Sequence, residues 1–206
     1  HVARTNKKER TFSALEVANI CGVVNQTAIN WIKDGHLKAF RTPGRQYRVY
    51  AEELARFLHS RGMKMPEELQ RVLAEQVAIE SVLIVDDDRD LNDLIKQFLE
   101  KRFPDYTVSQ AFDGFEAGKA LAESKPDIIL LDIDLPGVDG NKLCRSIKEE
   151  EGVAAPIVVA ISGLDDPSVR ERILGEGADS FISKPLDLEK LPQLFDELAE
   201  KRKHPV

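Results

Sequence analysis

The stretch SVLIVDDDRD, residues 81–90, decides the fold class of most of this chain. Its first five residues are β-prone and almost wholly apolar, which is typical of a strand buried on both faces of a parallel sheet. The strand ends abruptly in three consecutive carboxylates, Asp86, Asp87 and Asp88. Because like charges this close repel one another, their clustering at the end of a buried strand indicates that a positive charge belongs there.

Strands and helices alternate from this stretch to the end of the chain. We expect strands over 81–85, 106–111, 126–132, 155–162 and 180–183, and helices over 89–103, 115–124, 140–150, 167–177 and 188–203. Asp88 fits the N-cap of the first of these helices. Five strand–helix units predict an α/β domain with a mostly parallel, doubly wound sheet that is covered on both faces.

Polar side chains follow four of these strands at their carboxyl ends, where open α/β sheets form their sites. Asp86 and Asp87 follow the first strand, Asp132 ends the third, Ser162 the fourth, and Lys184 follows the fifth. The three carboxylates suit a hard cation such as Mg²⁺. A carboxylate can also attack a phosphoryl group to form an aspartyl phosphate, whose oxygens the cation, the ammonium and the hydroxyl would stabilise.

Four motifs in this order resemble those of response-regulator receiver domains: VDDD, LLDIDLPGVDG, AISG and FISKP. The resemblance spans nearly all of residues 81–203 and implies a flavodoxin-like (βα)5 fold with strand order 2-1-3-4-5. It further implies roles for individual residues: Asp132 as phospho-acceptor, with Lys184 and Ser162 assisting; Ser162 and Phe181 as switch residues; Asp86, Asp87, Asp132 and the backbone carbonyl of Asp134 as Mg²⁺ ligands; and a cis bond before Pro185. Ser162 and Phe181 stand where many members have Thr and Tyr.

A phosphatase of the haloacid-dehalogenase type is the enzyme alternative, because DIDLP superficially resembles that family's D-x-D-x-[TV] loop. Here, however, the acidic pair precedes the D-x-D, which lies at the third expected strand. The resemblance to receiver domains instead implies a regulatory protein that catalyses only its own phosphoryl transfer and dephosphorylation.

The charge of the chain is divided unevenly along its length. Residues 1–62 carry 11 basic and 5 acidic side chains (net +6), residues 63–80 carry net −2, and residues 81–206 carry net −11. A basic N-terminal part beside an acidic remainder predicts two domains with different partners. We expect boundaries of 1–62 for the first domain, 63–80 for a helical linker and 81–206 for the receiver.

The basic part contains the pattern of a winged helix-turn-helix. A first helix is expected with Thr11 or Ser13 as its cap, and a second from Asn25, with Asn25 as its cap. A hairpin is expected around Pro43-Gly44 before a third helix. Residues 1–10 are expected to form a mobile basic arm. The predicted DNA contacts are Gln26, Thr27, Asn30 and Lys33 on the second helix and Arg41, Arg45 and Arg48 on the hairpin.

Residues 11–60 resemble the helix-turn-helix of MerR and excisionase proteins, through SALEVANICGVVNQTAINWIKDGHLKAFRTPG and YRVYAEELARFL. Together the two resemblances predict a two-component response regulator. A sensor histidine kinase or phosphotransfer protein would phosphorylate it, and a phosphorylated homodimer would bind double-stranded DNA. Two alternatives stay open: an adaptor whose N-terminal domain binds protein, and a receiver that switches by partner binding without phosphorylation.

Cellular location is predicted from composition alone. The chain has no apolar run of about 18 residues and no charged-then-apolar leader, so neither membrane insertion nor export is expected. Cys21 and Cys144 lie far apart and lack metal-ligand spacing, which favours reduced thiols in a cytoplasmic protein.

Overall fold

The computed structural model describes residues 10–149 and 155–203, so the predicted N-terminal arm lies outside the described residues except for Arg10. The chain divides into two compact units, one built on residues up to Ala78 and one on residues 79–198. Each unit has its own apolar core. Within the described ranges, no helix combines the length and the apolar character needed to cross a bilayer.

The first unit is a small helical domain on a three-stranded antiparallel sheet. Its elements are β1 (Thr11–Ser13), α1 (Ala14–Cys21), α2 (Asn25–Lys33), β2 (Phe40–Arg41), β3 (Tyr47–Tyr50), α3 (Ala51–Ser60) and α4 (Glu67–Val77), and the strand order is β1-β3-β2. β2 and β3 form the predicted hairpin. Strand β1 was not predicted, because three residues are too few to show the alternation that identifies a strand.

The turn between α1 and α2 differs in one detail from the prediction. Ser13 caps α1 in a reciprocal capping box with Glu16, and Gly22 ends α1 in the left-handed conformation (φ 68°). The prediction that Asn25 caps α2 is wrong. Val24 holds the extended cap position, whereas Asn25 is already the first helical residue, so its side chain cannot cap the helix that it begins.

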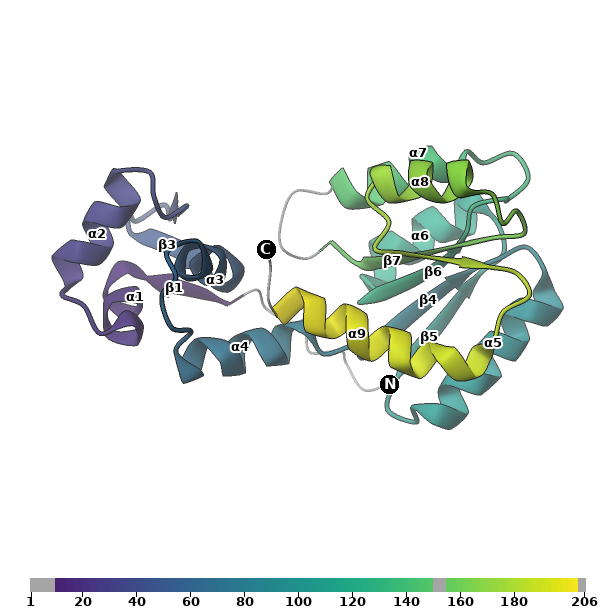
Figure 1. Ribbon diagram of the computed structural model, residues 1–206, viewed down its shortest axis with the longest axis horizontal. Helices are drawn as coiled ribbons and strands as arrows, with labels where there is room; N and C mark the ends of the chain where they lie inside the picture. The colour runs from purple at the N-terminus through teal and green to yellow at the C-terminus, as the bar shows by residue number, and fades with distance from the viewer. Residues whose placement is uncertain (1–9, 150–154, 204–206) are drawn as a thin grey trace. The chain divides into compact units, whose positions relative to one another are not determined.

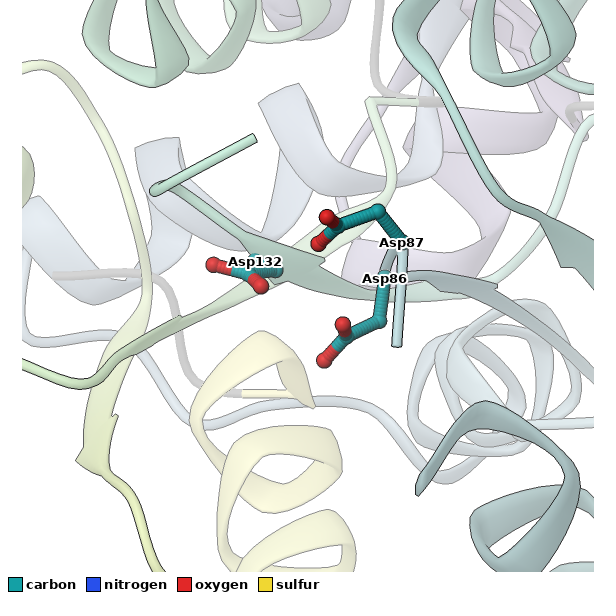
Figure 2. A group of neighbouring side chains, drawn as sticks. All are labelled: Asp86, Asp87 and Asp132. Carbon is teal, nitrogen blue, oxygen red and sulfur yellow. The ribbon is translucent and has the colours of Figure 1, made fainter. Parts of the chain in front are cut away.

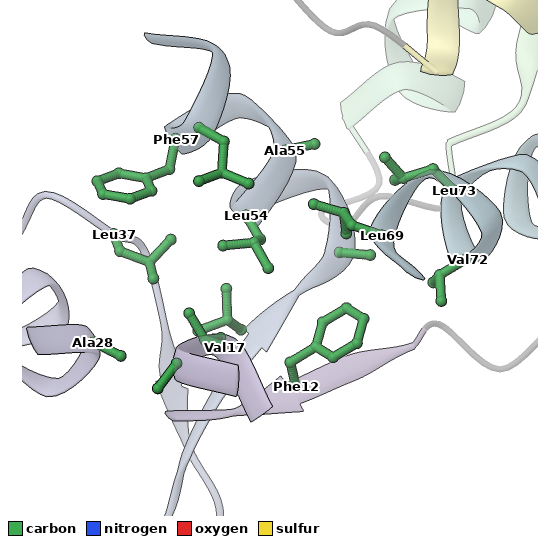
Figure 3. Close-up of a cluster of buried hydrophobic side chains, with 14 residues drawn as sticks. Phe12, Val17, Ala28, Leu37, Leu54, Ala55, Phe57, Leu69, Val72 and Leu73 are labelled. Atoms are coloured by element: carbon green, nitrogen blue, oxygen red, sulfur yellow. The ribbon is translucent and has the colours of Figure 1, made fainter. Parts of the chain in front are cut away.

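Figure 3 shows how the elements of the first unit share one core. Phe12 of β1, Val17 of α1 and Ala28 of α2 lie in the same buried cluster as side chains of α3. Helix α4 adds an apolar face to that cluster, since Leu69, Val72 and Leu73 are almost completely buried there.

The second unit is the expected α/β sandwich. Its elements are β4 (Ser81–Val85), α5 (Arg89–Arg102), β5 (Thr107–Ala111), α6 (Gly114–Ser124), β6 (Ile128–Asp132), α7 (Gly140–Glu149), β7 (Ile157–Ser162), α8 (Pro167–Gly175), β8 (Ser180–Ser183), a 3₁₀ turn (Leu188–Lys190) and α9 (Leu191–Lys203). The strands are all parallel in the order β5-β4-β6-β7-β8, which is the predicted 2-1-3-4-5.

Helices cover both faces of this sheet (Figure 1). Side chains of α6, α7 and α8 pack on one face, and side chains of α5 and α9 pack on the other. The central strands β4, β6 and β7 are buried at every residue, as a sheet covered on both faces requires. Asp88 caps α5, as predicted, by accepting a hydrogen bond from the Leu91 N–H. The expected cis bond joins Lys184 to Pro185.

Candidate functional site

Two neighbouring strand ends bring the predicted acidic residues together. Asp86 and Asp87 follow β4, and Asp132 ends β6, the neighbour of β4 in the sheet. One carboxylate oxygen from each of the three lies within 4.8 Å of the others. Figure 2 shows the three side chains grouped beside the ends of these strands. Asp86 and Asp132 are only 1% and 2% exposed, whereas Asp87 is open to solvent.

Lys184 supplies a positive charge to this group from the end of β8. Its Nζ lies 3.0 Å from Asp132 Oδ2 and 3.1 Å from Asp86 Oδ2. Its backbone N–H donates to the Ser162 carbonyl at 2.8 Å, which ties the loop to β7. Burial alone would lower the pKa of Lys184, but the two carboxylates outweigh burial and raise it, so the side chain stays protonated near neutral pH.

The surroundings of Asp86 change its pKa. Burial raises the pKa of Asp86, and the neighbouring charge of Asp132 adds to the rise, while the Asp88 N–H and the charge of Lys184 act against it. Asp86 Oδ1 accepts a hydrogen bond from that Asp88 N–H at 2.9 Å.

The other oxygen of Asp86 tests whether a cation fits this site. Oδ2 is buried and accepts no hydrogen bond from the residues that the structure describes, since the Lys184 ammonium lies at ion-pair distance but outside hydrogen-bond geometry. A buried carboxylate oxygen without a hydrogen bond, within reach of two further carboxylates, fits the ligand set of a hard divalent cation.

Asp132 has a partner at each oxygen. Oδ1 accepts a hydrogen bond from the Asp134 N–H at 2.8 Å, and Oδ2 accepts one from Lys184 Nζ at 3.0 Å. The carboxylate is thereby fixed in orientation at the strand end, with its charge partly balanced.

Ser162 lies at the end of the next strand, β7, and is completely buried. Its hydroxyl donates to Asp134 Oδ2 at 2.8 Å, and the Gly163 N–H donates to the same oxygen at 2.9 Å. The sequence prediction assigned Asp134 only through its backbone carbonyl. The contact of its side chain with Ser162 was missed, because residue order does not reveal which way a loop side chain turns.

Phe181, the predicted switch aromatic, lies in the core. It is 8% exposed and packs in the cluster between the sheet and helices α6 to α8. The guanidinium of Arg170, on α8, lies 5.9 Å from the centre of the Phe181 ring, a distance suited to a cation–π contact.

Asn92 is a site residue that the sequence prediction missed. It is fully buried on α5, and its amide nitrogen donates to the backbone carbonyls of Asp86 (3.0 Å) and Ala111 (3.1 Å). Gln110 donates in turn to the Asn92 side-chain oxygen at 3.0 Å. A signal was present in the sequence, since Asn92 shares a helical face with Ile95 and Leu99 and is the polar residue on that face.

The predicted nucleic-acid contacts lie on α2 and on the β2–β3 hairpin. On α2, Gln26, Asn30 and Lys33 are exposed and Thr27 is half-buried. The Gln26 amide donates to Asn30 Oδ1 at 2.9 Å, so these two side chains form a pre-organised polar pair on the helix surface.

The hairpin arginines differ in how they are held. Arg41 stacks over the Tyr47 ring, 4.6 Å from its centre, and donates to the Tyr47 hydroxyl. Arg48 is half-buried within β3. Arg45 is exposed in the loop and has a left-handed backbone (φ 61°), a conformation that costs energy in most residues other than glycine.

Comparison with known proteins identifies both units. Residues 82–196, more than half of the chain, match the family model of the response regulator receiver domain, and residues 12–62 match that of a helix-turn-helix domain. Response regulator MprA of Mycobacterium ulcerans is 38% identical over 110 residues, which make up 53% of this chain and 46% of that protein. The DNA-binding dual master transcriptional regulator RpaA of Synechocystis sp. is 38% identical over 113 residues, or 53% of this chain and 45% of that protein.

Among solved structures, the signal receiver domain of a DNA-binding response regulator protein (merR) from Colwellia psychrerythraea 34H is 36% identical, with a TM-score of 0.55. The match covers 58% of this chain and 98% of that one. The chain spans about half the length of the curated relatives that it matches. A receiver fold with an acidic group at the ends of its central strands, preceded by a helix-turn-helix domain, places this chain in the response regulator family.

Proposed function

We propose that this chain is a phosphorylation-controlled DNA-binding regulator whose phospho-acceptor is Asp132. The observation that carries the proposal is the position of that carboxylate, buried at a strand end beside Lys184 and the acidic pair. The donor is a sensor histidine kinase or a phosphotransfer protein, as expected for a response regulator.

In the proposed reaction, a carboxylate oxygen of Asp132 attacks the phosphorus of a phosphohistidine. The new P–O bond forms as the P–N bond breaks, and the bonding electrons leave with the imidazole, which then takes up a proton. Lys184 is placed to balance the charge that develops on the phosphoryl oxygens. Asp86, Asp87, Asp132 and the carbonyl of Asp134 would hold Mg²⁺, which when bound would neutralise charge on the phosphoryl group.

Phosphorylation is proposed to act through Ser162 and Phe181. The hydroxyl of Ser162 turns toward the new phosphoryl group, and Phe181 follows, which alters the surface of α8, β8 and α9. Such a local charge and packing change shifts the population between two forms of a receiver. The phosphorylated form is proposed to be a homodimer.

The N-terminal unit is proposed to bind double-stranded DNA as a MerR/excisionase-type winged helix-turn-helix. Its positive charge and the exposed polar face of α2 support this assignment, as does the match of residues 12–62 to a helix-turn-helix domain. The proposed contacts are those on α2 (Gln26, Thr27, Asn30, Lys33) and on the hairpin (Arg41, Arg45, Arg48). The proposed division is 1–62 for this domain, 63–80 for a linker helix that couples phosphorylation to DNA binding, and 81–206 for the receiver.

Mass spectrometry of the intact chain tests the acceptor directly. After incubation with a small phosphodonor and Mg²⁺, the wild-type chain should gain the mass of one phosphoryl group, and Asp132→Asn should gain none. Wild-type chain that remains unmodified would contradict phosphorylation and favour a receiver that switches by partner binding alone. If Asp132→Asn were labelled as fully as the wild-type chain, the phospho-acceptor would have to be another residue.

A gel shift against random duplex DNA at graded salt tests the partner of the N-terminal unit. Phosphate contacts release counterions, so DNA binding should weaken steeply as salt rises. No shift even at low salt would instead favour the adaptor whose N-terminal domain binds a protein.

A further inference from the structure

We propose that the Asp134 carboxylate is a positioning residue that holds the Ser162 hydroxyl away from the phosphoryl group until phosphorylation competes for it. The inference rests on the proposed function, since it concerns what Ser162 must give up when Asp132 is modified.

The hydrogen bonds of Ser162 are already in use. A serine hydroxyl has one proton to donate, and this proton goes to Asp134 Oδ2 at 2.8 Å. The hydroxyl oxygen in turn accepts the Leu164 N–H at 3.0 Å. To donate to a phosphoryl oxygen, Ser162 must therefore release a charge-assisted hydrogen bond to a carboxylate, which is among the stronger hydrogen bonds that a side chain makes.

Asp134 is well placed to act as this holder. Its backbone N–H donates to Asp132 Oδ1 at 2.8 Å, so the same residue contacts the acceptor through its main chain and Ser162 through its side chain. The Gly163 N–H also donates to Asp134 Oδ2 at 2.9 Å, which keeps the carboxylate turned toward β7 although the residue is exposed. A phosphoryl group on Asp132 thus competes with Asp134 for one proton, that of Ser162.

Four variants separate this role from a general effect of charge: Asp134→Ala, Ser162→Ala, the double variant, and Asp165→Ala. The last removes one carboxylate from the exposed loop that follows Ser162 and serves as the matched charge control. Ala at position 134 keeps the backbone N–H and carbonyl, so the proposed Mg²⁺ ligand and the contact with Asp132 are preserved. Thermal unfolding of each full-length variant confirms that it is folded.

The measurement is the affinity of the unphosphorylated chain for beryllium trifluoride, a non-covalent stand-in for a phosphoryl group, by calorimetry in the presence of Mg²⁺. Asp134→Ala should bind it about tenfold more tightly than wild type, because Ser162 no longer has a hydrogen bond to break. In the Ser162→Ala background the same substitution should change affinity by less than about twofold, and Asp165→Ala should match wild type.

Two outcomes would overturn the proposal while leaving the proposed function intact. Asp134→Ala could bind like wild type, or it could tighten binding equally with and without Ser162, which would reduce its effect to charge removal. Failure of every variant, wild type included, to bind beryllium trifluoride or to accept a phosphoryl group would overturn the proposed function and this inference together.

Discussion

Two residues of this chain occupy positions that are uncommon for their type, and Arg45 is the clearer case. Its left-handed backbone would suit glycine, yet the chain places a long cation there, at an exposed position in the hairpin loop. Asn92 is similar, because a polar amide occupies the buried face of α5 and holds the backbone of Asp86. In both cases the conformational or burial cost falls beside a candidate contact, where strain is commonly found.

Replacing Arg45 by glycine should separate stability from DNA binding. Arg45→Gly should raise the free energy of unfolding of the N-terminal unit by about 0.5–1 kcal/mol, because the left-handed strain is relieved. The same variant should bind DNA more weakly, with a salt slope smaller by about one unit. Chemical unfolding and salt-dependent fluorescence anisotropy measure the two effects.

Arg45→Ala is the matched control, since it removes the charge but keeps the strain. It should lose DNA affinity to the same degree without gaining stability. Equal DNA binding by wild type and both variants would remove Arg45 from the interface.

Replacing Asn92 by leucine should destabilise the second unit by about 1–3 kcal/mol, which is the cost of one buried group left without its partner. The Asp86 carbonyl would lose the Asn92 donor, whereas the Ala111 carbonyl would keep the backbone N–H of Asp86 at 3.2 Å. Urea unfolding measures the loss. Gln110→Met, which removes the donor to the Asn92 oxygen and to the Asp93 carboxylate, should cost less. A larger cost for Gln110→Met would show that the Asn92 contacts with the backbone are not the main stabilising ones.

At the scale of helices and strands, the sequence carried most of the information about the site. Parallel strands deliver their carboxyl ends to one edge, so the meeting of Asp86, Asp132 and Lys184 could be predicted from the order of the strands and their last residues. The sequence could not predict that Lys184 lies between two carboxylates. Nor could it predict that the Asp134 side chain turns toward Ser162. They depend on rotamers and loop paths that residue spacing leaves free.

Two glycines, one in α6 and one in α7, differ in how much space surrounds the place where a Cβ would lie. A Cβ at Gly140, the first residue of α7, would lie 2.6 Å from the Ile133 carbonyl oxygen and 2.7 Å from its Cα. Gly140→Ala should therefore push on the backbone between Asp132 and Asp134, destabilise the unit by about 1–3 kcal/mol and slow phosphorylation.

Gly118 is exposed on α6, and no atom of the described part of the chain lies within 4 Å of the place where its Cβ would be. Gly118→Ala should therefore stabilise the unit by about 0.5–1 kcal/mol. Urea unfolding and labelling by a phosphodonor measure both variants. If both substitutions changed the free energy of unfolding in the same direction, the close approach at Gly140 would be refuted.

At the scale of the whole molecule, two separate cores imply that the two units can unfold independently of one another. Magnesium should raise the unfolding temperature of the receiver unit and leave that of the N-terminal unit unchanged, because the acidic group of Asp86, Asp87 and Asp132 belongs to the receiver. Calorimetry of the full chain in Mg²⁺ and in EDTA tests this. Asp87→Ala, at an exposed position, should abolish the shift, and a shift retained in that variant would contradict the ligand set.

The dependence of this stabilisation on pH follows from Asp86. Its pKa is raised by burial, so the folded chain binds protons more readily than the unfolded chain between the ordinary carboxyl pKa of 3.8 and the raised one. Without metal, the contribution of Asp86 to stability therefore falls as pH rises through that window. With Mg²⁺ the trend should reverse, because the cation requires the ionised carboxylate. Unfolding temperatures measured across this range, with and without Mg²⁺, check both signs, and parallel curves would count against a metal at Asp86.

The packing of helix α4 decides where the chain can be divided to produce the N-terminal unit alone. Its inner face belongs to the same buried cluster as Phe12 and Leu54. A fragment that ends at residue 62 would expose the apolar surface that Leu69, Val72 and Leu73 cover in the whole chain. Such a fragment is expected to aggregate. A fragment that ends near Ala78 keeps this surface covered. Limited proteolysis should therefore leave α4 attached to the N-terminal fragment.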